Sequence, residues 1–488
     1  MPRLLLTLAL FLAVPIALHA QSDDASRLVA ALLGDTPMVS DLEALTDRIG
    51  GRPTGSAANQ RAFDWALERF REAGVPARKE PFQMPGLWLE RSARATVKGT
   101  GVTFNPRVAA LPFSTATQGS GLTAPLVDAG HGAEPDFAAL GGRAKGAFVL
   151  VETDELVDLD GLFHEYVEAG HIERRAIAAG AAGLVYMSSR PGNTLARHNA
   201  ALGWANRHPM MMMERDAAAR ALRLLRAGTP LTLTAALDIR SGPAYTAHNV
   251  IGEIRGSTRP DEIVLIGAHL DSWDLGTGAL DNGANSTMVI DIARQIVRLG
   301  LRPVRTIRFA LWNGEEQNLN GSYGYTLAHA TEMSRHVMAS SYDIGTGRIT
   351  GYFTGGRADL LPVLEHALAP VAGLGPFTHV NAPIVGTDNY DFMMQGVPNL
   401  VANQESANYG PNYHARSDEF GRADLRQLRL NAAIAAAATW GFATLDLSLP
   451  RQTAAQVDSM VRNTDLAAQM KSFNLYDAWV GGKRGLRQ

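Results

Sequence analysis

Apolar residues repeat at helical spacing in three parts of the chain. In residues 41–49 and 57–73 an apolar residue recurs every three to four positions, and glycines follow both segments. Residues 288–299 have the same spacing, behind Asn285 or Ser286 as a candidate N-cap. These segments are therefore predicted to be amphipathic helices.

Unbroken apolar runs mark a second kind of element. They occur at residues 262–267, 306–312 and 337–342, and runs of this length are typical of buried strands. A predicted helix lies between the first two. Strands that alternate with helices favour a mostly parallel sheet covered on both faces. In such folds the functional side chains lie just beyond the carboxyl ends of the strands.

Residues 119–242 have a different character. Short apolar runs at 147–152, 183–187 and 231–237 predict strands within this segment. Four methionines at 210–213 would alternate between the two faces of a strand, which favours core packing over a copper site. The segment is predicted to be a compact insert with its own core.

Composition narrows the classes of function. The chain has 488 residues, which predicts two or three domains, and its 46% hydrophobic and 19% charged content fits a globular protein. A net charge of -3 leaves no basic surplus for binding nucleic acid. The chain has no cysteine, which excludes disulfides, thiolate zinc sites and a cysteine nucleophile.

The first twenty residues are typical of an export signal. Arg3 supplies a positive charge, an apolar stretch runs over 4–18, and Leu18-His19-Ala20 precedes a predicted cut before Gln21. The alternative is a membrane anchor, but the stretch is short for a spanning helix and contains a proline. We therefore expect a periplasmic or secreted protein without a membrane anchor after cleavage.

Side chains with catalytic or metal-binding chemistry follow each of the three predicted strands. They are His269 and Asp271 after the first, Glu315 and Glu316 after the second, and Asp343 after the third. Asp281 opens the predicted helix that follows the first strand. Buried carboxylates need partners, and histidine with carboxylates suits zinc. A carboxylate between two metal ions can bridge them, so the pattern predicts a metal centre at this edge of the sheet.

Each of these residues also has a purely structural interpretation. His269 could be a loop histidine, Asp281 only a helix N-cap, and Asp343 the end of a strand. Adjacent acids such as Glu315 and Glu316 are usually solvated, and a lone histidine such as His414 is often a surface residue. Their occurrence together at strand ends favours the metal centre.

Five motifs occur in the order found in the dizinc exopeptidases. They are Gly267-Ala-His-Leu-Asp-Ser-Trp-Asp274, Ala279-Leu-Asp-Asn-Gly283, Trp312-Asn-Gly-Glu-Glu-Gln317, Tyr342-Asp-Ile-Gly345 and Tyr413-His-Ala-Arg-Ser-Asp418. The chain resembles this family, which includes aminopeptidase Y, bacterial leucyl aminopeptidases and plasma carboxypeptidase Q, and it looks most similar to the carboxypeptidase Q branch. The resemblance is strong over residues 250–440 and weaker at Ile49-Gly-Gly-Arg-Pro-Thr-Gly-Ser56.

The resemblance implies a fold and a division into domains. The fold would be a three-layer α/β/α sandwich with a mixed, mostly parallel sheet, plus an inserted small β-rich domain similar to the protease-associated domain. The expected parts are a signal peptide at 1–20, a discontinuous catalytic domain at 21–118 and 243–447, the insert at 119–242, and a C-terminal extension at 448–488. A helical stretch is expected at 454–470 in that extension.

The resemblance also implies roles for single residues. His269 and Asp343 would bind one zinc ion, Glu316 and His414 a second, and Asp281 would bridge both. Glu315 would be the general base, Asp271 would hold the ring of His269, and Tyr413 would face the oxyanion. Asn282 stands where many members carry a second acid.

The expected function is hydrolysis of terminal peptide bonds in peptides or dipeptides by water activated between two Zn²⁺ ions per chain. The substrate pocket is expected near residues 387–391 and 403–405, with Arg416 as a candidate for a substrate carboxylate. Aminopeptidase, dipeptidase and carboxypeptidase activity all stay open. The alternatives are an amidohydrolase or cyclase acting on a non-peptide amide, and a binding protein without activity. The resemblance further implies a homodimer.

Overall fold

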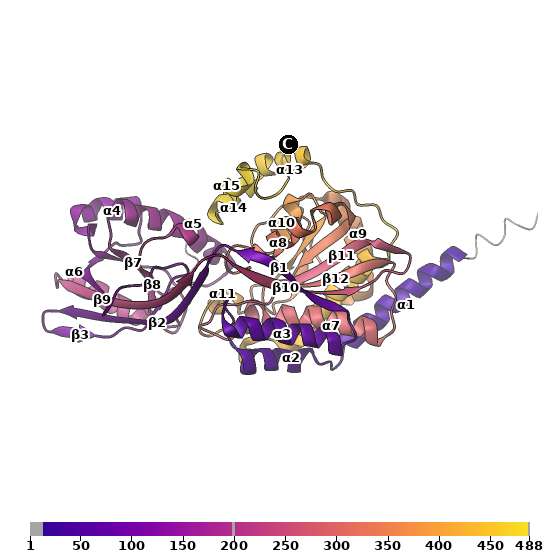
Figure 1. The fold of residues 1–488 in the computed structure, drawn as a ribbon, viewed down its shortest axis with the longest axis horizontal. Helices are drawn as coiled ribbons and strands as arrows, with labels where there is room; N and C mark the ends of the chain where they lie inside the picture. The colour runs from indigo at the N-terminus through magenta and orange to yellow at the C-terminus, as the bar shows by residue number, and fades with distance from the viewer. Residues whose placement is uncertain (1–12, 198–200, 487–488) are drawn as a thin grey trace, which may run out of the picture.

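The computed structural model describes residues 13–197 and 201–486, and it has two lobes (Figure 1). Each lobe contains one β-sheet. The predicted signal peptide lies largely outside the described residues, because only residues 13–20 of it are included, within helix α1 (Ala13–Leu33). In the described part of the chain, none of the helices combines the length and the apolar character needed to cross a bilayer.

The larger lobe is built on a seven-stranded mixed sheet. Its strands, in spatial order, are β1 (Ala77–Met84), β10 (Tyr245–Ile254), β12 (Arg305–Trp312), β11 (Arg259–His269), β13 (His336–Ser341), β15 (Asn399–Gln404) and β14 (Ile349–Phe353). The four strands from β12 to β15 are parallel, and β1, β10 and β14 pair antiparallel at the two edges. The predicted α/β fold with a mixed sheet is confirmed, but only three of the six strand pairings are parallel, where a mostly parallel sheet was expected.

Both faces of this sheet are covered, which makes three layers. Successive residues of β11 alternate between faces: Val264 and Ile266 pack into the core on one side, and Leu265 packs into the core on the other. One face carries α1, α2 (Met38–Ala44), α3 (Ala57–Glu72), α7 (Ala284–Arg298), α9 (Leu361–Ala367) and α12 (Leu425–Thr444). The other face carries α8 (Asn320–Ala328) and α10 (Asn389–Met394).

The smaller lobe is built on an eight-stranded sheet. Its strands, in spatial order, are β3 (Val102–Phe104), β2 (Leu87–Gly99), β9 (Leu231–Gly242), β5 (Leu122–Asp128), β6 (Phe148–Val151), β7 (Gly183–Met187), β8 (Met210–Met213) and β4 (Val108–Ala110). Its helices are α4 (Glu134–Leu140), α5 (Leu159–Ala178) and α6 (Arg215–Arg226).

Sheet membership differs from the expected start of the insert at residue 119. Strands β2 to β4 precede that residue and yet belong to the second sheet, because β2 pairs along its length with β9 and β4 pairs with β8. The four methionines of β8 alternate as predicted: Met211 and Met213 face one core of this lobe, and Met210 and Met212 face the other.

The C-terminal segment crosses from one lobe toward the other. It contains α13 (Ala454–Asn463), α14 (Leu466–Ser472) and α15 (Tyr476–Val480), where one helical stretch was expected at 454–470. The break falls at Thr464, which is in an extended conformation. In Figure 1 these yellow helices reach from above the larger lobe toward α5 of the smaller one.

Candidate metal centre

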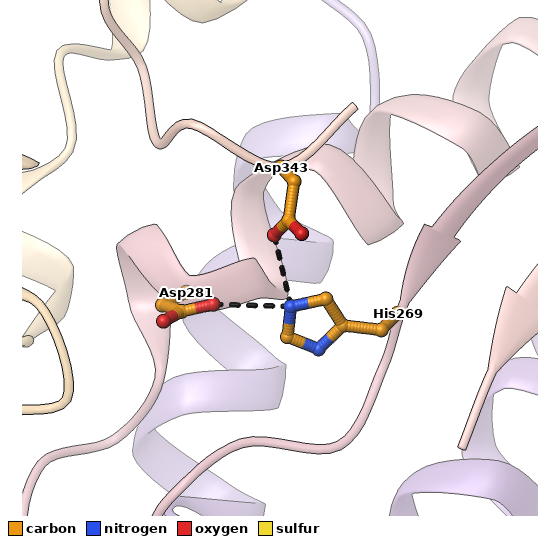
Figure 2. Close-up of side chains that lie close together, drawn as sticks. All are labelled: His269, Asp281 and Asp343. Carbon is orange, nitrogen blue, oxygen red and sulfur yellow. Dashed lines mark hydrogen bonds and ion pairs between the residues drawn. The ribbon is translucent and has the colours of Figure 1, made fainter. Parts of the chain in front are cut away.

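His269 and Asp343 meet at the carboxyl edge of the larger sheet. His269 is the last residue of β11, and Asp343 follows β13, its parallel neighbour. Figure 2 shows the two side chains pointing toward each other, with 2.9 Å between His269 Nε2 and Asp343 Oδ1. Both side chains are almost completely buried. The parallel pairing of β11 with β13 therefore places the first predicted pair as expected from strand ends.

Asp281 lies between the two predicted metal positions. Its Oδ1 is 3.1 Å from His269 Nε2, and its Oδ2 is 3.3 Å from His414 Nε2. The sequence predicted that Asp281 opens the following helix, and this prediction is wrong. Its φ and ψ angles are -121° and 90°, and α7 begins only at Ala284. This extended conformation presents its two carboxylate oxygens to different histidines.

The predicted N-caps of α7 also have other roles. Gly283 occupies the N-cap position, and Asn285 and Ser286 lie within the first turn of the helix. Ser286 Oγ donates to the backbone oxygen of His269 at 2.6 Å, and Asn285 Nδ2 donates to Asn282 Oδ1 at 2.7 Å. Both side chains therefore hold the loops of the centre rather than the end of the helix.

Glu316 and His414 form the second half of the cluster. Glu316 follows β12, and its Oε2 lies 2.8 Å from His414 Nε2. Potential ligand atoms of His269, Asp281 and Asp343 lie within 4.8 Å of one another, and so do those of Asp281, Glu316 and His414. The two groups share Asp281. Glu315 Oε2 is 3.9 Å from His269 Nε2, so Glu315 stands beside the cluster.

The tautomers of the two histidines show that a cation fits here. Nδ1 of His269 donates to the backbone oxygen of Asp271 at 2.9 Å, and Nδ1 of His414 donates to the backbone oxygen of Arg197 at 3.0 Å. In each neutral ring Nε2 then carries a lone pair, and that lone pair faces carboxylates. Each lone pair and the carboxylates that it faces would repel each other unless a cation lay between them. Glu316 Oε1, buried and without a hydrogen-bond partner among the described residues, fits the same conclusion.

The same crowding perturbs the acid–base behaviour of the cluster. Burial disfavours the imidazolium of His269, but the carboxylates of Asp343 and Glu315 outweigh it and raise its pKa well above the usual value. For His414, burial is likewise outweighed by Glu316, and the pKa rises to about 9. Burial raises the pKa of Glu315 well above its usual value. Protons would thus occupy the cluster whenever no metal ion does.

Asp271 contacts the ring of His269, the role implied for it, through its backbone oxygen. The ring of His269 is held by the backbone oxygen of Asp271, and its carboxylate Oδ1 lies 3.7 Å from the ring nitrogen. That carboxylate accepts hydrogen bonds from Thr54 Oγ1 at 2.8 Å and from the backbone N–H of Glu315 at 3.4 Å. Asp271 therefore also links the β11 loop to the loop that carries Glu315.

Two buried charges support the backbone of the centre. Asp418 accepts hydrogen bonds from the backbone N–H groups of Leu280 at 2.6 Å and Asp281 at 3.1 Å. The fully buried guanidinium of Arg52 donates to the carbonyls of Leu270, Thr277 and Gly278. Arg52 lies in the segment Ile49–Ser56, and Asp418 lies in the motif Tyr413–Asp418. The sequence did not predict that they support the backbone, because these contacts depend on the tertiary fold.

The loop of His414 is held by the smaller lobe. Besides the ring contact, the backbone N–H of Arg197 donates to the carbonyl of His414 at 2.8 Å, and Ala196 forms an antiparallel bridge with Ala415. Tyr413 Oη is hydrogen-bonded to Tyr166 Oη of α5. The sequence did not indicate Tyr166 and Arg197, because neither residue lies in any of the five family motifs.

Two adjoining pockets open at the cluster. They have volumes of about 190 and 80 Å³. The first is lined by Phe113 and Trp204 of the smaller lobe, and the second by apolar side chains such as Phe163, Ile344 and Val385. Of the predicted pocket segment 387–391, the second pocket includes Thr387 and Asn389.

The charged candidates for substrate binding lie elsewhere. Asp391 pairs with Arg484, and Glu405 pairs with Arg348. Arg416 is exposed and lines neither pocket. The described lining residues of both pockets include no lysine or arginine.

Comparison with known proteins agrees with this geometry. Residues 249–439 match the model of peptidase family M28. Human carboxypeptidase Q is 25% identical over 414 residues, which cover 84% of this chain and 86% of the relative. The family model therefore assigns residues 249–439 to peptidase family M28. The predicted family resemblance is thereby confirmed, and the chain is a metallopeptidase related to carboxypeptidase Q.

Solved structures extend the similarity to the fold. A peptidase M28 precursor from Shewanella amazonensis superposes with a TM-score of 0.79 at 26% identity, covering 89% of this chain and 99% of that one. A zinc aminopeptidase from Bacillus subtilis gives a TM-score of 0.65 at 20% identity, covering 85% and 96%. The chain thus shares the fold of the Shewanella amazonensis protein across both lobes.

Proposed function

We propose that this M28 member is an exported dizinc exopeptidase that removes the N-terminal residue of short peptides, dipeptides included. Its assignment as a zinc-dependent exopeptidase follows from the family. The observation that supports two ions rather than one is Asp281, whose two carboxylate oxygens face different histidines. His269 and Asp343 would complete one site, and Glu316 and His414 the other. Histidine and carboxylate ligands are the set that zinc accepts.

Zinc bound at this centre supplies Lewis acidity, which polarises the scissile carbonyl and lowers the pKa of a bound water. Glu315 is the general base in the proposal, because it lies beside the cluster and lines both pockets. It would take a proton from the attacking water and return it to the leaving amine. The proposed charge on Glu315 depends on the loaded centre, since burial raises its pKa in the protein alone.

Tyr413 is the proposed hydrogen-bond donor to the developing oxyanion. Burial raises the pKa of its phenol well above the usual value, so the hydroxyl stays protonated and is able to donate. The side chain lines both pockets, and its ring stacks on that of His414 with 3.7 Å between the ring centres. A donor at this place would strengthen as negative charge develops on the carbonyl oxygen.

The pocket chemistry favours recognition of a free amine. Glu315 lines both pockets, Glu316 and Asp343 line one each, and the described linings carry no lysine or arginine for a substrate carboxylate. The smaller pocket is mostly apolar, which suits an apolar N-terminal side chain. These features support an aminopeptidase that also accepts dipeptides.

We also propose three properties of the whole protein. The export signal at residues 1–20 would place the enzyme in the periplasm or outside the cell. The smaller lobe would be an inserted domain similar to the protease-associated domain. The functional unit would be a homodimer, as the carboxypeptidase Q resemblance implies. The proposed partners are the peptide substrate and a second copy of the chain, with no nucleic acid.

The proposed reaction can be tested with three substrates and one variant. Leucyl-alanine, leucine amide and N-acetyl-leucyl-alanine are offered to zinc-loaded protein, with Glu315→Gln as the control. We expect hydrolysis of the first two only, and a loss of about 10²–10⁴-fold in kcat in the variant without loss of zinc. Cleavage of the blocked substrate would contradict recognition of a free amine. A protein with two zinc ions that cleaves none of the three would point to a non-peptide amide, and a zinc-free chain to a binding protein.

A further inference from the structure

The C-terminal extension is anchored on the larger lobe next to the catalytic loops. Its apolar side chains form one cluster with residues of the larger lobe, including Leu319, Val385 and Met394. The buried guanidinium of Arg484 pairs with Asp391 at 2.7 and 2.8 Å and donates to the backbone oxygen of Leu319 at 3.1 Å. Because of this packing, α13 to α15 are fixed relative to the metal centre.

The end of α14 reaches the smaller lobe across the pockets. The ring of Phe473 stacks on Tyr166 of α5, with 5.1 Å between ring centres and 30° between ring planes. The side chain of Asn474 donates to the backbone oxygen of Ala201. The extension therefore contacts both lobes at the place where the two pockets adjoin.

Phe473 and Tyr166 belong to the walls of both pockets. Each pocket is also lined by Glu315 and Tyr413. A peptide bond held at the metal centre would place its N-terminal residue on one side of this aromatic pair and its leaving group on the other. The pocket volumes, about 190 and 80 Å³, are below the roughly 300–1,000 Å³ of sites for drug-sized ligands. Each side has space for a small group rather than for several residues.

We propose that the C-terminal extension closes the cleft and that Phe473, stacked on Tyr166, limits the substrate to peptides of two or three residues. This inference rests on the proposed exopeptidase function and concerns only the length of the substrate. The ring acts by steric exclusion: a longer leaving group would have to displace it from Tyr166 or separate α14 from α5. Phe473 is thus a residue that determines specificity.

The test compares a dipeptide with a pentapeptide that has the same N-terminal residue. Leucyl-alanine and leucyl-tetra-alanine are assayed separately with zinc-loaded full-length protein, and the ratio of their kcat/KM values is measured. Phe473→Ala should shift this ratio toward the pentapeptide by roughly tenfold or more, and Phe473→Trp should shift it the other way. Tyr476→Ala is the matched control, because Tyr476 packs on the same apolar cluster as Phe473 and lines neither pocket.

The outcomes separate this inference from the proposed function. A wild-type enzyme that favours the dipeptide, with the ratio shifted by both Phe473 variants and not by Tyr476→Ala, supports the inference. Equal kcat/KM values for the two peptides in the wild type would overturn it and leave the exopeptidase assignment standing. A ratio that Tyr476→Ala shifts as much as Phe473→Ala does would also overturn it. A wild type that cleaves neither peptide would contradict the proposed function itself.

Discussion

Replacement of Arg197 by methionine should destabilise the junction between the lobes. The guanidinium is 1% exposed and pairs with Glu90 at 2.6 Å and with Asp274 at 2.8 Å. Methionine has an unbranched side chain that fills part of the same space without the charge, so both carboxylates would lose their partner. Removing one partner of a buried ion pair typically costs about 3–5 kcal/mol. Since Asp274 is 27% exposed, we expect the lower end, about 3 kcal/mol.

The assay is differential scanning calorimetry of zinc-free and zinc-loaded protein. A loss of about 3 kcal/mol corresponds to a fall of roughly 6–12 °C in the unfolding midpoint of a domain of 150–250 residues, and to somewhat less in a larger unit. In the zinc-loaded protein the fall should be larger. The backbone oxygen of Arg197 holds the ring of His414, and disturbing such a contact typically weakens metal binding by roughly 10–100-fold.

A triple variant shows whether unpaired charge is the cause. Arg197→Met combined with Glu90→Gln and Asp274→Asn leaves no unpaired carboxylate, so it should recover at least half of the lost stability. A midpoint of Arg197→Met within 2 °C of the wild type would refute the reasoning. A triple variant less stable than Arg197→Met would refute it as well, because the loss would then come from packing or from the hydrogen bond to Ala110.

Three further predictions follow from the structure. Chelation of zinc should lower the unfolding midpoint, and zinc at about 100 times its Kd should restore about 2.7 kcal/mol; an unchanged midpoint would show that the centre does not hold metal. Burial raises the pKa of Glu173 to about 7, so its contribution to stability is complete below pH 4.5 and is lost as the pH rises through 7. Urea unfolding should show that Glu173→Gln removes a decline of about 3 kcal/mol over that range, and an identical pH profile would contradict this. Arg484→Met should lower kcat more than it changes KM, by up to roughly 100-fold, because Arg484 holds the carbonyls of Asn318 and Leu319 next to Glu315; an unchanged kcat would mean that this anchor does not position the loop.

The sequence pattern placed together those residues of the candidate centre that lie at or just beyond strand ends. His269 ends one strand of the mixed sheet, and Glu316 and Asp343 follow two others. The alternation of apolar runs with helices is enough to bring such positions to one edge. Asp281 and His414 lie several residues beyond the ends of β11 and β15, not directly at a strand end. Only their motifs pointed to the centre, and the local pattern led to a wrong interpretation of Asp281 as the start of a helix.

Contacts between distant segments could not be predicted in the same way. Tyr166 and Phe473 are separated by hundreds of residues, and neither lies in a pattern that a single sequence makes visible. Arg197 contributes a backbone oxygen to the centre, which leaves no trace in residue type. The expected boundary at residue 119 differed from the sheet for a related reason: the sheet that a strand joins is decided by its pairing, and β2 pairs with β9, which lies far away along the chain.

The central claim is that two zinc ions lie between His269, Asp343, Glu316 and His414 with Asp281 shared. It is tested most directly by a crystal structure of the zinc-loaded protein with anomalous data collected at the zinc edge. The account predicts two anomalous peaks in each chain, each in contact with a different carboxylate oxygen of Asp281. A single peak, or two peaks of which neither touches Asp281, would contradict it.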